Sequence, residues 1–443
     1  MKHKLMRALT SIWLIFLVAL GARLAYAWDQ QHKIPGDALV MRFQQETGFI
    51  AASLASGKGF SSPMGRETGP TAWLPPIYPL LLSGVFRIFG IETVRSFLGA
   101  VAMNIVFSAS ACLPIFYAGK RIAGLPAASA AAWFWALLPN AVTFPFEWIW
   151  DSSLVALLTA TLLWATLELA ESPRLRDWCA YGLLWGIALL TDPSLGAALP
   201  LLLGWAAYRA RSHGLTRLQG PALAAACAIL CCLPWTVRNY VVFHRFMPLR
   251  SNFAYELFTG NNENYDDHPP VWPNNITRAR EIYRFFRIGE TAFMQEEMHK
   301  ALQFITSHPR IELRLTWDRV VSFWMGTPSP LDNLLSADSF FLRSVSVCSF
   351  LLVLGTIGGI AVLFVTRSEF ALPAASFPLV FPLTFYVTHA SLRFRHSIEP
   401  ILALLTAIAA DALLRRIFVS KPNVPARTIL RSVVAEQPGN HRV

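Results

Sequence analysis

Long apolar runs separated by short polar connections dominate the sequence. A membrane-spanning helix needs about 20 mostly apolar residues, and the runs predict about ten spans. They lie at residues 9–28, 95–118, 124–146, 152–170, 178–193, 195–208, 221–241, 340–365, 370–389 and 397–414. We interpret the first run as a retained anchor rather than a signal peptide, because its cleavage signal is weak and many spans follow. The pattern predicts an all-α polytopic membrane protein.

Two long segments do not fit the pattern of spans. The first, 29–94, contains an apolar piece from Trp73 to Gly90 that prolines interrupt, so we expect a juxtamembrane helix on the membrane surface. The second, 242–339, starts with turn residues and predicts helices near 278–306 and 310–323. The predicted organisation is therefore as follows: a transmembrane catalytic module, 1–241, including outer loop 29–94; an extracytoplasmic loop or small helical domain, 242–339; C-terminal transmembrane helices, 340–416; a cytoplasmic tail, 417–443.

Composition agrees with a membrane protein. The 443 residues are 54% hydrophobic and only 15% charged, which excludes a soluble globular enzyme, a disordered chain and a disulfide-stapled secreted domain. The net charge of +11 comes from basic clusters on alternate connections, on the same side as the N-terminus. By the positive-inside rule that side is cytoplasmic. Segments 29–94 and 242–339 then lie outside, and we expect the basic residues to contact lipid, with no nucleic acid partner.

The sequence contains no recognisable cofactor motif. Its six cysteines all fall in apolar runs, without the spacing of metal ligands. No P-loop, dinucleotide glycine pattern or serine nucleophile motif is found in a suitable context. We therefore predict no metal and no cofactor.

Acidic residues on the outer side are candidates for catalysis, because charge at the membrane boundary persists mainly where it lines a site. Glu46 begins a short amphipathic pattern and is either a solvated surface residue or a general base. Glu147 and Asp151 are spaced i,i+4, which predicts one shared helix face. Asp151 is alternatively the N-cap of the next helix. The neighbouring Trp148 and Trp150 are typical interface anchors, although indole rings also stack on sugars.

Basic residues on the outer side break the positive-inside rule and are candidates for phosphate binding. Arg393, Arg395 and His396 open the last span, and Glu399 follows them. Two guanidinium groups at a helix N-terminus predict an anion site for phosphate or for lipid headgroups. Arg238 lies at the outer end of another span, as a second phosphate contact or as a snorkelling side chain.

These segments together resemble the C-type (GT-C) integral-membrane glycosyltransferases, in particular the bacterial proteins similar to dolichyl-phosphate-mannose–protein mannosyltransferases and to the aminoarabinose transferase of lipid A. The likeness covers most of the chain in order. It rests on ETGFIAASLASGKGF (46–60), PTAWLPPIYPLLLSGVFRIFG (70–90), Asp151, LPWTVRNY (233–240) and RFRHSIEP (393–400).

The resemblance implies a hexosyl- or pentosyltransferase that moves a sugar from a polyprenyl-phosphate donor to a glycan, lipid or protein acceptor, with inversion. It implies an active site at the periplasmic face of a bacterial inner membrane. Glu46 would then be the general base, Asp151 would position the acceptor or the base, and Arg393 and Arg395 would hold the lipid phosphate. The remaining predicted substrate-binding residues are His396, Arg238, Glu147, Trp73 and Tyr78.

Two other functions remain open from the sequence. A flippase or transporter of lipid-linked sugars would use the same outer arginines, but it predicts internal repeats and polar residues at mid-membrane depth. A ligase or polymerase of lipid-linked glycans would have a similar outer loop and a diphosphate leaving group. The phosphate species that the purified protein releases separates all three.

Overall fold

The computed structural model describes residues 9–172, 174–210, 219–262, 275–326 and 340–419. Within these ranges the chain is helical and forms no named strand; one isolated bridge joins Ser61 and Pro70. The first half contains α2 (Ile12–Lys33), α3 (Gly36–Val40), η1 (Met41–Phe43), α4 (Glu46–Ala55), α5 (Ile77–Phe89), α6 (Val94–Ser110), α7 (Cys112–Ala123), α8 (Leu125–Leu137), α9 (Pro139–Glu147), α10 (Ser152–Leu169), α11 (Leu175–Leu189), η2 (Pro193–Ala198) and α12 (Leu199–Ala210). The second half contains α13 (Gln219–Phe243), α14 (Phe253–Gly260), α15 (Asn275–Ile288), α16 (Glu290–Ser307), α17 (Pro309–Met325), α19 (Phe340–Val365), α20 (Ala371–Val380), α21 (Leu383–Val387), α22 (Leu392–His396) and α23 (Glu399–Val419).

Every apolar run singled out in the sequence contains helix, but not every helix is long enough to cross a membrane. Among the described residues, five helices have the length and apolar composition of a span: α2, the α6–α7 pair, α10, α13 and residues 343–365 of α19. The pair α8 and α9, bent by 41°, makes a sixth if it is one span. The number of ten spans therefore stays a prediction, since helices such as α11 have only 15 residues.

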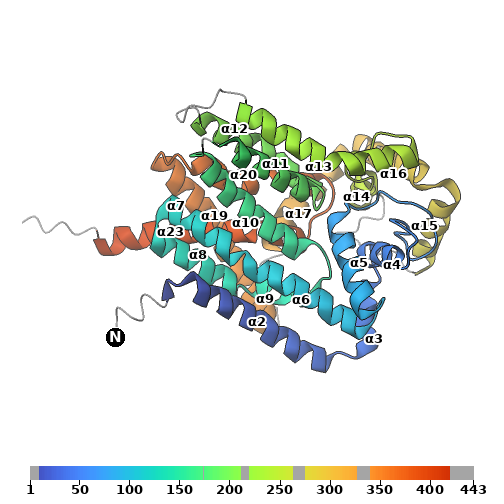
Figure 1. Cartoon of the computed structure of the whole chain (residues 1–443), viewed down its shortest axis with the longest axis horizontal. Coiled ribbons are helices and arrows are strands. Elements are labelled where there is room, and N and C mark those ends of the chain that lie inside the picture. The colour runs from blue at the N-terminus through green and yellow to red at the C-terminus, as the bar shows by residue number, and fades with distance from the viewer. Residues whose placement is uncertain (1–8, 173, 211–218, 263–274, 327–339, 420–443) are drawn as a thin grey trace, which may run out of the picture.

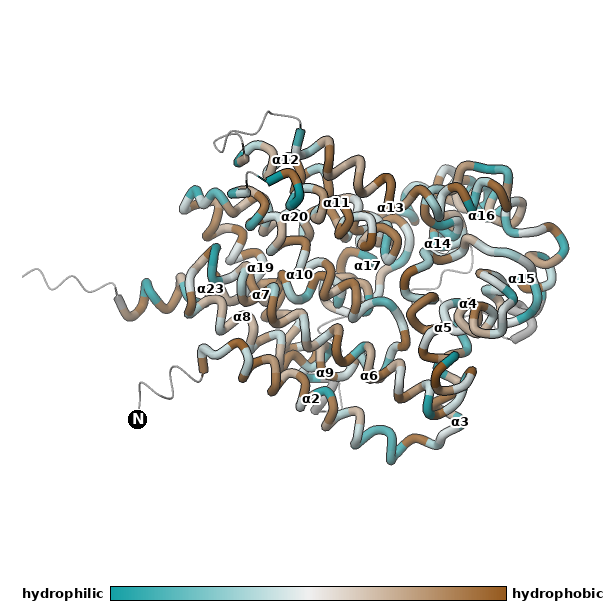
Figure 2. The backbone as a smooth tube through the Cα atoms, viewed as in Figure 1, coloured by the Kyte–Doolittle hydropathy of each residue, from teal (hydrophilic) through white to brown (hydrophobic). Residues whose placement is uncertain are grey.

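The helices separate into a bundle and a group at one end of it. Figure 1 shows α4, α5, α14, α15 and α16 gathered at the end of the bundle opposite the N-terminus. Hydrophobic residues run along the bundle helices in Figure 2, whereas hydrophilic residues are frequent in α15 and α16. The predicted helical segment within 242–339 is thus present, and its first helix is divided at Gly289, where the backbone turns with φ 79°.

Close backbone contacts hold the bundle together. α19 packs along α23, and α11 packs along α13. A Cβ on Gly359 of α19 would lie 2.2 Å from the carbonyl oxygen of Leu405 in α23, so only glycine permits this approach. α5 begins directly after Pro75-Pro76 and has one buried face, which includes Tyr78 and Phe86. Its helical form agrees with the predicted juxtamembrane helix, and its place on a membrane surface stays a prediction.

Candidate active site

Charged side chains from five separate segments meet where the bundle adjoins α4 and α14. Arg393 of α22 interacts electrostatically with Asp151, Glu256, Glu46 and Asp192. Arg250 and His389 also belong to this group. Arg250 interacts electrostatically with Asp151 and Glu256, and both Arg250 and Arg393 interact electrostatically with His389. We call the set the charged cluster: Glu46, Asp151, Asp192, Arg250, Glu256, His389 and Arg393. All seven side chains are only partly exposed, so their charges act on one another with limited screening by water.

Asp151 lies in the connection between α9 and α10. It occupies the N-cap position of α10, but its side chain makes no capping hydrogen bond. Burial raises the pKa of Asp151 to about 7, and the carboxylate of Asp192 adds to the increase, while Arg393 and Arg250 oppose it. A carboxyl group with this pKa exchanges protons readily near neutral pH.

Glu46 is the first residue of α4, and a local contact attaches this helix end to the Asp151 connection. The side-chain amide of Gln45 donates to the carbonyl oxygen of Ile149 at 3.0 Å. Glu46 also acts on the hydroxyl of Tyr255 in α14, whose pKa is raised first by burial and then by this carboxylate. The predicted short helix is therefore present, and it brings Glu46 into the same cluster as Asp151.

Aromatic rings hold the Arg393 guanidinium. Its central carbon lies 4.0 Å from the ring centroid of Trp150 and 5.7 Å from that of Trp148, which are cation–π distances. Burial lowers the pKa of Arg393, and the cluster carboxylates counter that effect. In the part of the chain that the structure describes, no carboxylate oxygen forms a salt bridge with Arg393.

His389 and Glu256 form the side of the cluster that faces α14. Nδ1 of His389 lies 3.3 Å from Oε2 of Glu256, and the amide of Asn252 donates to Oε1 of Glu256 at 2.8 Å. Burial lowers the pKa of His389 to about 3, and three arginines nearby act in the same direction. Burial raises the pKa of Glu256, against the effect of Arg250 and Arg393. His389 is therefore neutral at pH 7.

The structure corrects the prediction that Arg393 and Arg395 form one anion site. Arg395 is fully buried; Nε and Nη2 donate to Glu399 at 3.1 and 2.8 Å, Nη2 also donates to Ser349, and Nη1 donates to the Trp324 carbonyl. Residues two apart on a helix point in different directions. Arg395 is thus an internal ion-pair partner.

His396 shares that interior position and is likewise corrected as a substrate contact. It is fully buried, with Nδ1 2.7 Å from Oε2 of Glu399 and its ring stacked on Trp135 at 5.3 Å. Glu399 is therefore the shared partner of Arg395 and His396 in the interior.

Glu147 does not share a helix face with Asp151. α9 ends at Glu147 and α10 begins at Ser152, so the i,i+4 interpretation is wrong. Glu147 instead forms an ion pair with Arg42 at 2.8 Å and accepts a hydrogen bond from the Tyr26 hydroxyl at 2.7 Å. The break between the helices is what turns Asp151 toward Arg393.

Arg238 fastens a loop to α13 and does not reach the charged cluster. It donates to the carbonyl oxygens of Thr71 at 2.6 Å and of Phe60 at 2.9 Å, and its guanidinium lies over the Trp235 ring at 5.0 Å. Neither the phosphate contact nor the snorkelling side chain describes this arrangement. Arg238 holds the 60–71 segment against the end of a span.

Trp73 and Tyr78 are core residues in this structure. Trp73 is buried against Tyr255, Phe285 and Phe293, with the Tyr255 ring centroid 5.0 Å away. The buried Tyr78 hydroxyl donates to Oδ1 of Asn104 at 2.9 Å. Their side chains have no surface to offer a substrate, which corrects the prediction that they bind one.

Four members of the cluster were missed in the sequence: Asp192, Arg250, Glu256 and His389. Asp192 carried a usable signal, because it follows an apolar helix on the same side as Asp151. Arg250 lies in the connection after α13, and Glu256 is the one charged residue of the short apolar helix α14. Their role depends on α14 packing beside α22, a long-range arrangement.

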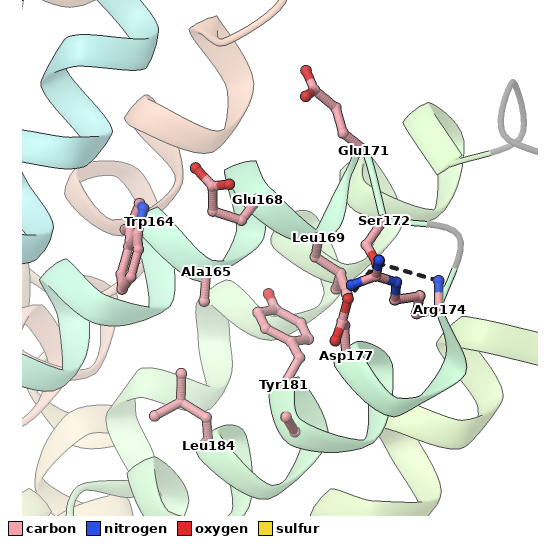
Figure 3. Close-up of a pocket in the computed structure, with 11 residues that line it drawn as sticks. Trp164, Ala165, Glu168, Leu169, Glu171, Ser172, Arg174, Asp177, Tyr181 and Leu184 are labelled. Atoms are coloured by element: carbon pink, nitrogen blue, oxygen red, sulfur yellow. Dashed lines mark hydrogen bonds between the residues drawn. The ribbon is translucent and has the colours of Figure 1, made fainter.

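A cavity of about 590 Å³ lies at the other end of α10, between α10 and α11. Figure 3 shows Glu168, Asp177 and Arg174 at this cavity, with Trp164, Tyr181 and Leu184 beside them. Glu168 forms an ion pair with Arg121, and Ser172 donates to Asp177. At 1.5 Å per helical residue, α10 separates Glu168 from Asp151 by about 25 Å. The cavity is therefore distinct from the charged cluster.

Among the described residues, no group of three or more His, Cys, Asp or Glu side chains has an arrangement that could hold a metal ion.

Comparisons with known proteins place this geometry in a family context. Residues 74–237 match the family model described as dolichyl-phosphate-mannose-protein mannosyltransferase. No curated protein matches the sequence. The oligosaccharyltransferase AglB of Archaeoglobus fulgidus, in complex with an inhibitory peptide and a dolichol-phosphate, is similar with a TM-score of 0.54 and 14% identity over 94% of this chain and 51% of that chain.

Two other solved structures extend the comparison. The apo form of the Archaeoglobus fulgidus oligosaccharyltransferase gives a TM-score of 0.53 and 12% identity over 93% of this chain and 51% of that chain. ArnT from Cupriavidus metallidurans, bound to undecaprenyl phosphate, gives a TM-score of 0.41 and 15% identity over 91% of this chain and 78% of that chain. The chain spans about half the length of the archaeal structures. At these identities the archaeal likeness concerns the fold.

The resemblance to the GT-C glycosyltransferases that the sequence predicts is confirmed by the family match and the archaeal fold. The described part of the chain is all-helical, and its fold is similar to that of the archaeal oligosaccharyltransferase.

Proposed function

We propose that this protein is a multi-pass glycosyltransferase that moves a sugar from a polyprenyl-phosphate donor to an acceptor hydroxyl, with inversion. The observation that carries the proposal is the charged cluster, because it joins two carboxylates, Glu46 and Asp151, to the guanidinium of Arg393. These residues are far apart in the sequence and occur in a chain with the GT-C fold. The match to a family described by a dolichyl-phosphate-mannose donor, and the dolichol-phosphate bound to AglB, support the donor class.

In the proposed reaction Glu46 takes the proton of the acceptor hydroxyl while the hydroxyl oxygen attacks the anomeric carbon. The bond between that carbon and the phosphate oxygen breaks, and polyprenyl phosphate leaves from the opposite face of the sugar. Arg393, together with Arg250, stabilises the negative charge on the leaving phosphate. No general acid is needed, because a phosphate is a good leaving group at neutral pH.

Asp151 is proposed to hold the acceptor. With a pKa of about 7 it exists partly protonated at neutral pH, so it can accept a hydrogen bond from a sugar hydroxyl or donate one to it. Asp192 helps to maintain that state, since its carboxylate disfavours a second negative charge nearby. Glu46 and Asp151 would then have different roles, one as the base and one as a positioning group.

The site is proposed to lie on the extracytoplasmic face of a bacterial inner membrane. The cluster is at the end of α10 away from Glu168, which pairs with Arg121. Arg121 belongs to one of the basic connections that the positive-inside rule assigns to the cytoplasm. The opposite end, with Asp151, is then the outer one.

The test is Glu46→Gln in purified protein supplied with a panel of labelled polyprenyl-phosphate and polyprenyl-diphosphate sugars. A general base contributes about 10²–10⁴-fold, so we expect turnover to fall by at least 100-fold while donor binding persists. The matched control is Glu67→Gln, an exposed carboxylate in the same outer segment whose one ion pair among the described residues is with Lys58; it should retain turnover.

Near-normal turnover in Glu46→Gln would remove Glu46 from the role of base. The released lipid decides between the three functions left open by the sequence. Polyprenyl phosphate supports the transferase, polyprenyl diphosphate supports a ligase or polymerase, and transport without any release supports a flippase.

A further inference from the structure

One buried guanidinium in α17 ties together the three segments that surround the Arg393 side of the cluster. Arg319 is 1% exposed and donates to Oε1 of Glu312, within α17, at 3.0 Å. It also donates to the carbonyl oxygens of Gly260 at 2.6 Å and Tyr386 at 3.1 Å, and to Oδ1 of Asn261 at 2.9 Å. A single side chain therefore connects α17, the end of α14 and the end of α21.

The end of α14 and the turn after α21 also touch directly. The amide of Asn261 donates to the carbonyl oxygen of Val387 at 2.9 Å. A Cβ on Gly260 would lie 1.7 Å from the carbonyl oxygen of Thr388, so any side chain at position 260 would force the two segments apart. One residue later, His389 faces Glu256 across the same junction.

The contact between the end of α14 and the turn after α21 lies just before Arg393, the residue proposed to bind the donor phosphate. Arg393 follows His389 by four residues, and Phe394 stacks on Phe385 of α21 at 4.4 Å. Phe385 in turn stacks on Phe323 of α17 at 5.8 Å. The direction of the Arg393 side chain is thus set by a turn whose backbone carbonyls are bound by Arg319 and whose rings pack on α17.

We propose that Arg319 is a positioning residue that fixes the α21–α22 turn against α14 and thereby places Arg393 for phosphate binding. The inference rests on the proposed function, since it assigns Arg319 to the phosphate side of that site. Arginine suits this position because its planar fork supplies several donors to carbonyl oxygens at once and stays charged when buried. Arg319 acts through Arg393 and contacts no substrate.

The test compares Arg319→Gln with Arg23→Gln. Arg23 is the matched control because it is another fully buried arginine, which donates to Ser108 and to the carbonyl oxygens of Ala19 and Ala136 among α2, α6 and α8. Both variants lose a buried, multiply bonded guanidinium. Only Arg319 is attached to the turn that precedes Arg393.

Two measurements report on the turn in full-length protein in micelles. The first is the Kd for farnesyl phosphate, a short polyprenyl phosphate, and the second is amide hydrogen exchange over residues 386–396. For Arg319→Gln we expect the Kd to rise at least tenfold and the exchange to accelerate at least tenfold. For Arg23→Gln we expect a lower melting temperature with both values within twofold of wild type.

Gly260→Ala keeps the proposal testable if Arg319→Gln does not fold. It leaves Arg319 in place but presses on the carbonyl of Thr388, so it should raise the Kd and the exchange in the same direction. Unchanged Kd and exchange in a folded Arg319→Gln or Gly260→Ala protein would overturn the proposal, as would equal changes in Arg23→Gln. Wild-type protein that fails to bind farnesyl phosphate would count against the proposed function, and the exchange measurement would still decide the role of Arg319.

Discussion

Arg393 and Arg395 are two positions apart, and replacing each with glutamine should affect different properties. Arg395→Gln should lower stability, whereas Arg393→Gln should lower transfer activity. Arg395→Gln removes a fully buried partner of Glu399, which among the described residues then keeps His396 and the amide of Asn140 at 3.1 Å. Breaking a buried ion pair by removing one partner costs about 3–5 kcal/mol. We therefore expect Arg395→Gln to lower the melting temperature strongly in detergent micelles.

Arg393→Gln should instead leave the fold largely intact. Arg393 is only partly buried and has no salt bridge among the described residues, so the loss in stability should be about 1 kcal/mol. Loss of a preorganised charge that faces a developing anion costs about 10²–10³-fold in rate. The assay is transfer from a labelled polyprenyl-phosphate sugar, normalised to folded protein by size-exclusion chromatography.

The paired design separates a binding role from a structural one. The structural role of Arg395 is refuted if Arg395→Gln melts like wild type while its transfer activity is lost, because Arg395 would then act on substrate. The binding role of Arg393 is equally refuted if Arg393→Gln retains normal transfer. A Lys at position 393 keeps the charge without the fork, and we expect it to recover part of the activity.

Three further predictions concern the surroundings of the cluster. Asp151 has a folded pKa of about 7 against 3.8 when unperturbed, so its ionisation destabilises the folded protein progressively as pH rises from about 4 to 7. Asp151→Asn should therefore raise the melting temperature at pH 8 by the equivalent of about 2 kcal/mol, after allowance for partial exposure. At pH 4 the same substitution should hardly change the melting temperature. Trp73→Ala should cost about 3–5 kcal/mol by emptying a buried aromatic site, and faster limited proteolysis between α14 and α16 would show it, whereas an unchanged digestion pattern would contradict the packing. Glu147→Gln weakens a partly exposed ion pair with Arg42, so transfer activity should stay within threefold of wild type. A loss of transfer activity above tenfold would instead indicate that Glu147 contacts the substrate.

Much of the helical architecture is predictable because it depends on local sequence. Apolar run length predicts where helices lie, and proline and glycine predict where they begin or end, as at Pro75-Pro76 before α5. The division at Gly289 escaped prediction, since a glycine within a helical pattern is often tolerated. Span number is harder, because short helices such as α11 are apolar without being long.

The candidate site was only partly predictable. Glu46, Asp151 and Arg393 were singled out as charges at the outer ends of apolar segments, a rule that asks only where burying a charge is costly. The same rule selected Arg395 and Glu147, which are satisfied by Glu399 and Arg42. A charge at a boundary is explained equally well by a buried partner or by a ligand, and the sequence does not distinguish them.

By itself the sequence determined the helical membrane class, the order of the segments and some of the charges at one end of them, because hydrophobicity and local backbone preference act over a few residues. Tertiary structure alone decided which of those charges face one another. Arg393 meets Glu46 and Asp151, whereas Arg395 turns into the core toward Glu399. The reason is that a side chain's direction within a short helix, and the partner it meets, depend on how distant helices such as α14 and α17 pack against it.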